Sequence, residues 1–219
     1  MNHLAREISK PMLLLAGFAL AGTLLLAGVH RLTAQPIADS EAQALLTRIN
    51  TLVAANRYDN NPLTDTIRLP PAELQSAEPV LVYRLRKQQQ PVAAIFTVTT
   101  PEGYSGNIRL AVGVNVDQTL AGVRVLAHKE TPGLGDWIEL EKSDWMLGFS
   151  GKSLQTPPET AWAVKKDGGE FDQFTGATIT PRAVVAAVKQ VLIWSKQHPT
   201  SVYAPSTPTE VLTGEGKQP

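Results

Sequence analysis

The longest uncharged apolar run of the chain lies near its N-terminus, at residues 11–29. About 20 apolar residues cross a bilayer as a helix, so this run predicts one transmembrane anchor. A cleavable signal peptide is the alternative, but its apolar core is usually shorter, and Leu32 stands where a small residue is favoured before a cleavage site. Arg6 and Lys10 precede the run, and the positive-inside rule therefore puts residues 1–10 in the cytoplasm.

Two later stretches repeat apolar residues at helical spacing. Residues 39–56 carry an apolar stripe, and Asp39 or Ser40 can cap a helix there. Residues 181–196 repeat valine and leucine at intervals of three and four. Between them, residues 136–149 hold enough apolar positions for one or two short helices.

Short runs rich in β-branched and aromatic residues alternate with polar or glycine-containing turns. They predict strands at 80–86, 92–99, 108–116 and 120–127. The last two form a hairpin around Asp117 and Gln118. A further strand is expected at 161–166. This order predicts an α+β fold: a mainly antiparallel twisted sheet with flanking helices, preceded by one N-terminal transmembrane helix.

The composition changes at the C-terminal end. From Pro199 onward Pro, Ser, Thr and Gly dominate, which indicates a disordered tail at 199–219. One globular domain of ordinary size, residues 30–198, remains between this tail and the anchor.

Composition also restricts the chemistry. The formal net charge is zero, so nothing points to nucleic acid as a partner. The chain has no cysteine, which excludes disulfides, Cys-ligated iron–sulfur clusters and thiol catalysis. Of the four histidines, only His128 falls well inside the predicted domain, so no multi-histidine metal site is expected. A redox role would therefore require an organic cofactor.

The segment before the last predicted helix is rich in small and hydroxyl residues. Thr180 suits the N-cap and Pro181 the first helical position. Thr178 then lies just before a helix N-terminus, where free amides and the positive dipole end favour a phosphate. Gly176 allows a close backbone approach, and Ala177 keeps the turn narrow. By itself this segment leaves an ordinary capped helix as the alternative.

The loop after the predicted strand 120–127 offers a second candidate surface. Pro132 fixes a turn, and the glycines on either side of Leu134 let the backbone lie close to a flat or bulky group. Glu130 brings a hydrogen-bond acceptor, and Leu134 and Trp137 bring apolar surface. An ordinary strand-to-helix loop is the alternative here.

Three motifs occur in a telling order: GYSG at 103–106, HKETPGLG at 128–135 and DQFTGAT at 172–178. With the preceding apolar run, they resemble the FMN-binding domain of the G subunit of the Rnf/Rsx electron-transport complex. They also resemble the C subunit of the sodium-translocating NADH:quinone reductase. The resemblance covers nearly the whole chain except the tail. The compact length and the ETPGLG wording look more like the Rnf protein.

The resemblance implies a role for particular residues. In the family motif the last hydroxyl residue forms a phosphoester with FMN, and that position is Thr178. Thr175, Gly176 and Ala177 match the rest of the motif, and Asp172 matches the acid by which a flavin transferase recognises it. The flavin contacts expected from the HKETPGLG segment are Glu130, Thr131, Gly133 and Leu134. No metal ligands and no catalytic residues are implied.

The resemblance also implies a function. The chain would be an electron carrier with covalent FMN, a redox subunit of an inner-membrane translocase that couples ferredoxin and NAD electron transfer to ion movement. Its partners would be the other subunits and, during maturation, the flavin transferase. It would span the membrane once, with the main domain periplasmic. Two alternatives stay open: the related quinone-reductase subunit, and a membrane-anchored scaffold domain without a cofactor.

Overall fold

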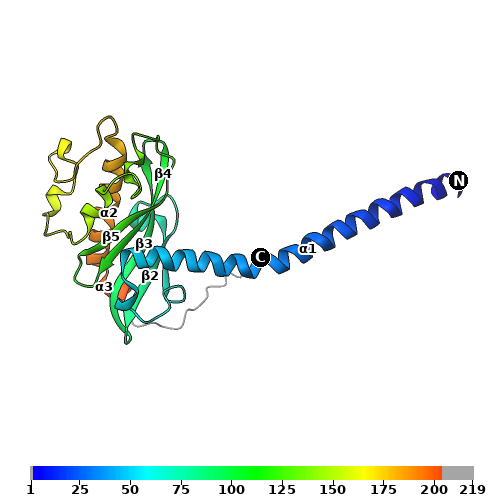
Figure 1. Cartoon of the computed structure of the whole chain (residues 1–219), viewed down its shortest axis with the longest axis horizontal. Coiled ribbons are helices and arrows are strands. Elements are labelled where there is room, and N and C mark those ends of the chain that lie inside the picture. Colours follow the sequence, from blue (N-terminus) through cyan, green and yellow to red (C-terminus); the bar gives the residue numbers. More distant parts are fainter. Residues whose placement is uncertain (1, 204–219) are drawn as a thin grey trace, which may run out of the picture. The chain divides into compact units, whose positions relative to one another are not determined.

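The computed structural model of this chain describes the backbone of residues 2–203, and the side chains there except at 2–11, 13 and 29–42 (Figure 1). The chain divides into two compact units, which meet in sequence between Thr47 and Arg48. The first unit is most of helix α1 (Asn2–Leu52), and the second unit holds the sheet and the remaining helices.

Helix α1 runs without a break from Asn2 to Leu52. The prediction of a separate helix capped at Asp39 or Ser40 is therefore wrong, because both residues lie inside one helix that also passes through Pro36. Neighbouring residues with high helix propensity, such as the alanines and glutamines of this stretch, continue the helix although proline removes one backbone hydrogen bond.

Part of α1 carries the predicted anchor at 11–29. Among the described residues, no helix combines the length and the apolar character needed to cross a membrane. The side chains described without interruption here are those of 14–28, and the ends of the predicted span lie outside the described side chains. Within that run large apolar groups such as Leu14 and Phe18 are exposed.

The second unit is built on one five-stranded antiparallel sheet in the order β1-β2-β3-β4-β5. The strands are β1 (Thr66–Leu69), β2 (Val80–Lys87), β3 (Gln90–Gly103), β4 (Gly106–Asn115) and β5 (Leu120–Ala127). The four predicted strands and the α+β class are confirmed. The edge strand β1 was not predicted, because four residues between Asp65 and Pro70 are too few to show an alternating pattern.

Helix α2 (Ile179–Gln197) packs against β3 and β4 and closes the hydrophobic core. Its valines at 184, 188 and 191 are fully buried, and Trp194 meets Phe96 of β3 edge to face at 6.0 Å. A short helix α3 (Pro199–Tyr203) follows, with Val202 buried and the Tyr203 hydroxyl donating to the Asn115 carbonyl at 3.1 Å. The predicted tail is thus wrong for its first five residues, which one apolar anchor and one hydrogen bond attach to the domain; 204–219 lie outside the described residues.

Between β5 and α2 the chain forms only short 3₁₀ helices: η3 (Asp136–Ile138), η4 (Trp145–Phe149), η5 (Glu159–Ala161) and η6 (Lys165–Asp167). The short helices predicted within 136–149 are confirmed. The strand predicted at 161–166 is wrong, since only Val164 pairs, in one isolated bridge with Phe171. The chain reverses at Gly168, with φ +83°, and Gly169 then lies so close to Ala163 that no side chain fits between them.

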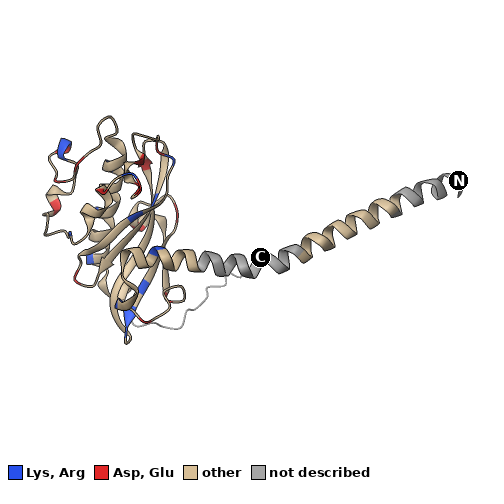
Figure 2. Ribbon diagram, in the orientation of Figure 1, with Lys and Arg blue, Asp and Glu red and all other residues tan. Residues whose placement is uncertain are grey.

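This irregular segment has its own aromatic core. Phe149 stacks on Phe171 at 4.9 Å, and Trp162 lies 4.9 Å from the same ring. Trp145 meets Phe149 edge to face at 5.2 Å. Acidic and basic residues are interspersed along the ribbon of the domain (Figure 2), in keeping with the zero net charge of the chain. Aromatic packing therefore holds a segment that lacks regular hydrogen-bonded structure.

Candidate cofactor site

A buried carboxylate joins three distant segments of the domain. Glu130, only 4% exposed, follows β5. It accepts hydrogen bonds from the backbone N–H groups of Tyr104, at 3.2 Å, and Ser105, at 2.9 Å, in the turn between β3 and β4. The hydroxyl of Thr180, in the first turn of α2, donates to the same carboxylate. Because a buried charge must be satisfied, these bonds connect the β3–β4 turn, the loop after β5 and the start of α2.

Two glycines make room for this carboxylate. A Cβ at Gly135 would lie 2.8 Å from the Glu130 Cβ and 2.9 Å from the Thr180 hydroxyl oxygen. A Cβ at Gly103 would lie 3.0 Å from Glu130 Oε1 and 2.2 Å from the Gly106 carbonyl oxygen. Both positions therefore require glycine for the space it leaves, and neither has a positive φ.

His128 orients the loop that carries Glu130. Its Nδ1 accepts the backbone N–H of Glu130 at 3.0 Å, so the ring proton is on Nε2, which donates to Glu139 at 2.7 Å. The histidine thus bridges the end of β5 to the residues after η3. Among the residues that the structure describes, no cluster of acidic or histidine side chains could hold a metal ion.

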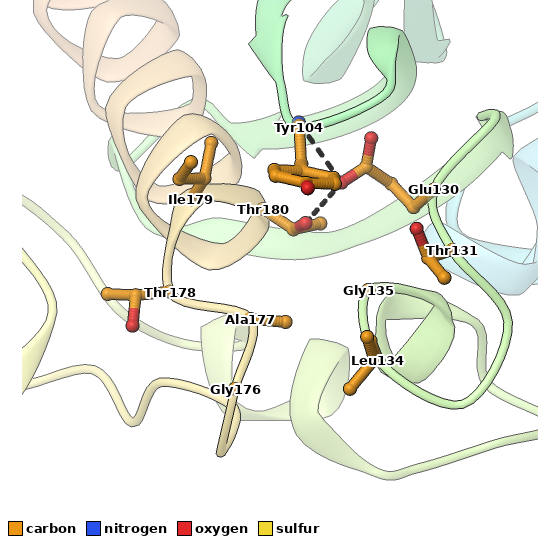
Figure 3. A pocket seen from close by; sticks show the side chains of 10 residues that line it. All are labelled: Tyr104, Glu130, Thr131, Leu134, Gly135, Gly176, Ala177, Thr178, Ile179 and Thr180. Carbon is orange, nitrogen blue, oxygen red and sulfur yellow. Dashed lines mark hydrogen bonds between the residues drawn. The ribbon is translucent and has the colours of Figure 1, made fainter.

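A cavity of about 380 Å³ opens between these segments (Figure 3). It has two sides. The Glu130 wall consists of Tyr104, Glu130, Thr131, Leu134, Gly135 and Thr180, and the Thr178 wall consists of Gly176, Ala177, Thr178 and Ile179. Figure 3 shows Thr178 at one side of the cavity and Glu130 and Thr131 at the other. The lining combines apolar groups, hydroxyls and backbone, as small-ligand sites do.

The threonines around the start of α2 have different surroundings. Thr180 is 1% exposed, and its hydroxyl is bonded to Glu130. The prediction that Thr180 caps the helix is wrong: α2 begins at Ile179, and a charged acceptor binds this hydroxyl more strongly than backbone amides would. Thr178 occupies the cap position, with no side-chain cap hydrogen bond. Pro181 is the third helical residue, where its missing N–H still leaves no intrahelical bond unmade.

The Thr178 wall is held from behind by Trp145. The indole N–H of Trp145 donates to the Asp172 carbonyl at 2.9 Å, and its ring meets Phe174 edge to face at 5.1 Å. The turn then closes with a bridge between Phe174 and Ala177. Gly176 adopts φ +80°, a conformation that a side chain disfavours.

The structure brings six of the expected site residues to the cavity: Glu130, Thr131, Leu134, Gly176, Ala177 and Thr178. Three others do not line it. Thr175 is exposed, Gly133 presents its carbonyl to the Trp137 indole at 3.3 Å, and Asp172 forms an exposed ion pair with Lys165 at 2.6 Å.

Four lining residues were not predicted as site residues: Tyr104, Gly135, Ile179 and Thr180. Gly135 and Thr180 stand in or next to motifs that were recognised, so their neighbourhood was a usable signal. Tyr104 lies in the GYSG turn, but only the tertiary bond to Glu130 brings that turn to the cavity.

An exposed ion pair lies beside the N-terminal turn of α2. Arg182 donates two hydrogen bonds to Asp167, both at 2.5 Å. The hydrogen bond and the positive charge of Arg182 lower the pKa of Asp167 below its ordinary value. This pair ties η6 to α2 from the solvent side.

Comparison with known proteins agrees with this arrangement. Residues 103–193 match the family model described as an FMN-binding domain, and residues 1–52 match the RnfG N-terminal region. The first match includes every residue that lines the cavity. The chain therefore carries an FMN-binding domain behind an N-terminal helical region.

Similar proteins identify the family more closely. The RnfG-type component of the ion-translocating oxidoreductase complex of Pseudoalteromonas atlantica is 45% identical over 200 residues, 91% of this chain and 93% of its own. The corresponding protein of Vibrio cholerae is 44% identical over 93% of this chain and 97% of its own, and that of Pseudomonas aeruginosa 46% over 91% and 94%. The chain belongs to this RnfG family, which confirms the resemblance stated from the motifs.

Proposed function

We propose that this chain carries FMN as an electron-transfer subunit of an ion-translocating oxidoreductase complex, with the other subunits of that complex as its partners. The observation that carries the proposal is the cavity of about 380 Å³ at the start of α2, inside the region that matches an FMN-binding domain. When bound, FMN supplies the redox chemistry, and the residues of the chain bind and orient it.

The described residues fit a phosphorylated flat ligand. Thr178 immediately precedes α2, where the first amides of the helix lack intrahelical acceptors and favour an anion. Its hydroxyl makes no cap bond and is free for another use. Leu134 and Ala177 offer apolar surface, and Gly176 leaves the backbone accessible.

Covalent attachment through Thr178 is part of the proposal. A threonine hydroxyl attacks phosphorus only when a base or metal activates it. The one carboxylate that lines the cavity, Glu130, already accepts three hydrogen bonds. A separate flavin transferase therefore supplies the activation. The Thr178 oxygen bonds to the phosphorus of the FMN half of FAD, the phosphoanhydride bond to AMP breaks, AMP leaves, and the threonine proton passes to the transferase.

Residues of the motif that do not line the cavity would serve this transferase. Asp172 is exposed and pairs only with the exposed Lys165, and Thr175 is exposed three residues before the attachment site. Both are thus accessible to a second protein. Gly133 would act through its turn, which sets the position of Leu134.

The attachment is tested on the full chain, produced with and without a flavin transferase and separated on a denaturing gel. The wild-type band should fluoresce only with the transferase and gain the mass of FMN less one water. Thr178→Ala should lose the fluorescence, and Thr178→Ser, which keeps a hydroxyl, should retain it. Thr175→Ala should weaken the band without abolishing it.

Fluorescence that persists in Thr178→Ala would move the attachment elsewhere. A wild-type chain that never fluoresces and binds no FMN would favour the cofactor-free scaffold.

We further propose that residues 11–29 anchor the chain, with 1–10 in the cytoplasm and the domain from 30 onward in the periplasm. Support comes from the uncharged sequence of this run and from its exposed apolar side chains on a continuous helix. A flavin that cannot dissociate suits a compartment poor in free FMN.

The topology is tested with a reporter fused after Pro219, which leaves α3 intact. We expect activity of a periplasm-dependent phosphatase and none of a cytoplasm-dependent one. The opposite pattern would overturn the orientation.

A further inference from the structure

We infer that Tyr104 is the aromatic contact of the flavin ring: its phenol packs against the isoalloxazine and fixes the orientation of the ring in the cavity. This inference rests on the proposed function and adds to it a residue outside the two motifs that suggested the site.

Tyr104 is the single aromatic residue among the ten that line the cavity in the described chain. Its side chain is 68% exposed. Within residues 2–203, its hydroxyl makes no hydrogen bond and its ring meets no other ring. A large aromatic group left in solvent beside a cavity has apolar surface to bury, and a flat π-system offers the matching surface.

The backbone of Tyr104 is held firmly although its ring is free. Its N–H donates to the buried Glu130 carboxylate at 3.2 Å, and the next residue, Ser105, donates to the same group at 2.9 Å. Gly103 packs against Glu130 without room for a side chain, and Gly106 turns the chain with φ +115°. The ring is thus presented from a fixed point and does not need a mobile loop to reach the ligand.

The opposite side of the cavity suits the second face of a flat ring. Leu134 and Gly176 lie across from Tyr104 in Figure 3, with Ala177 between them and the start of α2. These residues expose a methyl-bearing side chain, a bare backbone and a single methyl. A flavin held between the tyrosine ring and this narrow surface would be enclosed by apolar groups on both faces, while its phosphate reached Thr178.

The test compares Tyr104→Phe and Tyr104→Leu with the wild type, all as full chains carrying the flavin. Two signals are measured: flavin fluorescence before and after denaturation, and circular dichroism in the visible flavin bands. A phenol against the flavin quenches its fluorescence by donating an electron to the excited ring, whereas a fixed ring orientation gives dichroism.

Tyr104→Leu should raise the native fluorescence and weaken the dichroism, because losing an aromatic pair shifts the ratio of packed to free flavin about two- to tenfold. Tyr104→Phe should raise the fluorescence as well but keep the dichroism, since the ring remains and the electron donor is lost. After denaturation all three should fluoresce equally.

Tyr58→Leu is the matched control, since Tyr58 does not line the cavity, and it should leave both signals unchanged. Equal fluorescence and dichroism in Tyr104→Leu and wild type would overturn the inference. That outcome differs from failure of the proposed function, in which the wild-type chain carries no flavin on the denaturing gel.

Discussion

The two walls of the cavity are built by different forces. The Glu130 wall is held by a buried carboxylate with three hydrogen-bond donors and by glycines packed against it. The Thr178 wall is held by aromatic contacts from behind and ends in exposed residues, among them Thr175 and Asp172. A wall of satisfied buried polar bonds resists opening, whereas a wall on the surface can meet another protein. The pair thus combines a fixed reference for the ligand with an accessible point of attachment.

Removing the carboxylate tests the Glu130 wall and should have the largest effect. Glu130→Leu leaves the N–H groups of Tyr104 and Ser105 and the Thr180 hydroxyl without an acceptor. At about 1–3 kcal/mol for each buried donor left unsatisfied, the free energy of unfolding should fall by about 3 kcal/mol or more. Urea denaturation of the full chain in mild detergent, followed by tryptophan fluorescence, measures it.

The control is Glu141→Leu, which removes an exposed carboxylate and should change the free energy of unfolding by less than about 0.5 kcal/mol. If both variants were equally stable, the carboxylate would not hold this wall.

Trp145→Phe tests the Thr178 wall and should have a smaller effect. The ring contact with Phe174 is largely kept, but the bond from the indole N–H to the Asp172 carbonyl is lost, at a cost of about 1 kcal/mol. Amide hydrogen exchange should become faster in 172–178 and stay unchanged around Tyr104.

Trp137→Phe gives the matched comparison, because it removes an indole bond on the opposite side, to the Gly133 carbonyl. Faster exchange in 172–178 in this variant too would mean that the two walls open together.

Arg182→Gln removes the exposed pair beside α2 and should have the smallest effect. The pKa of Asp167 is lowered by Arg182, so its contribution to stability is present above the ordinary carboxyl pKa of 3.8 and is lost as the pH falls through the lower folded value. The variant should return the pKa of Asp167 toward 3.8, as followed by NMR titration, with thermal stability at neutral pH unchanged. A pKa that stayed low would assign the shift to another group.

The regular half of the fold follows from the sequence pattern. Strands β2 to β5 and helix α2 each bury one face against a single core, so alternation and helical spacing locate them. The aromatic segment between β5 and α2 has no such period. Its chain reversal depends on the close approach of Gly169 to Ala163, a tertiary contact that made 161–166 look like a strand.

The site was predictable in part for the same reason. The attachment motif and the loop after β5 are local in sequence, and both reach the cavity. The partner of Thr180 is Glu130, 50 positions earlier, and the contact between the Tyr104 amide and Glu130 spans 26 positions. No local pattern reports contacts of that range, so Thr180 was mistaken for a cap and Tyr104 was not considered.

The burial of the Thr180 hydroxyl has a consequence for regioselectivity. The sequence offers three threonines within six positions, at 175, 178 and 180. An enzyme acting on the folded domain meets only two of them, because the third is occupied as a donor inside the protein. The substrate's own fold thus removes one competing nucleophile before the modifying enzyme makes any choice.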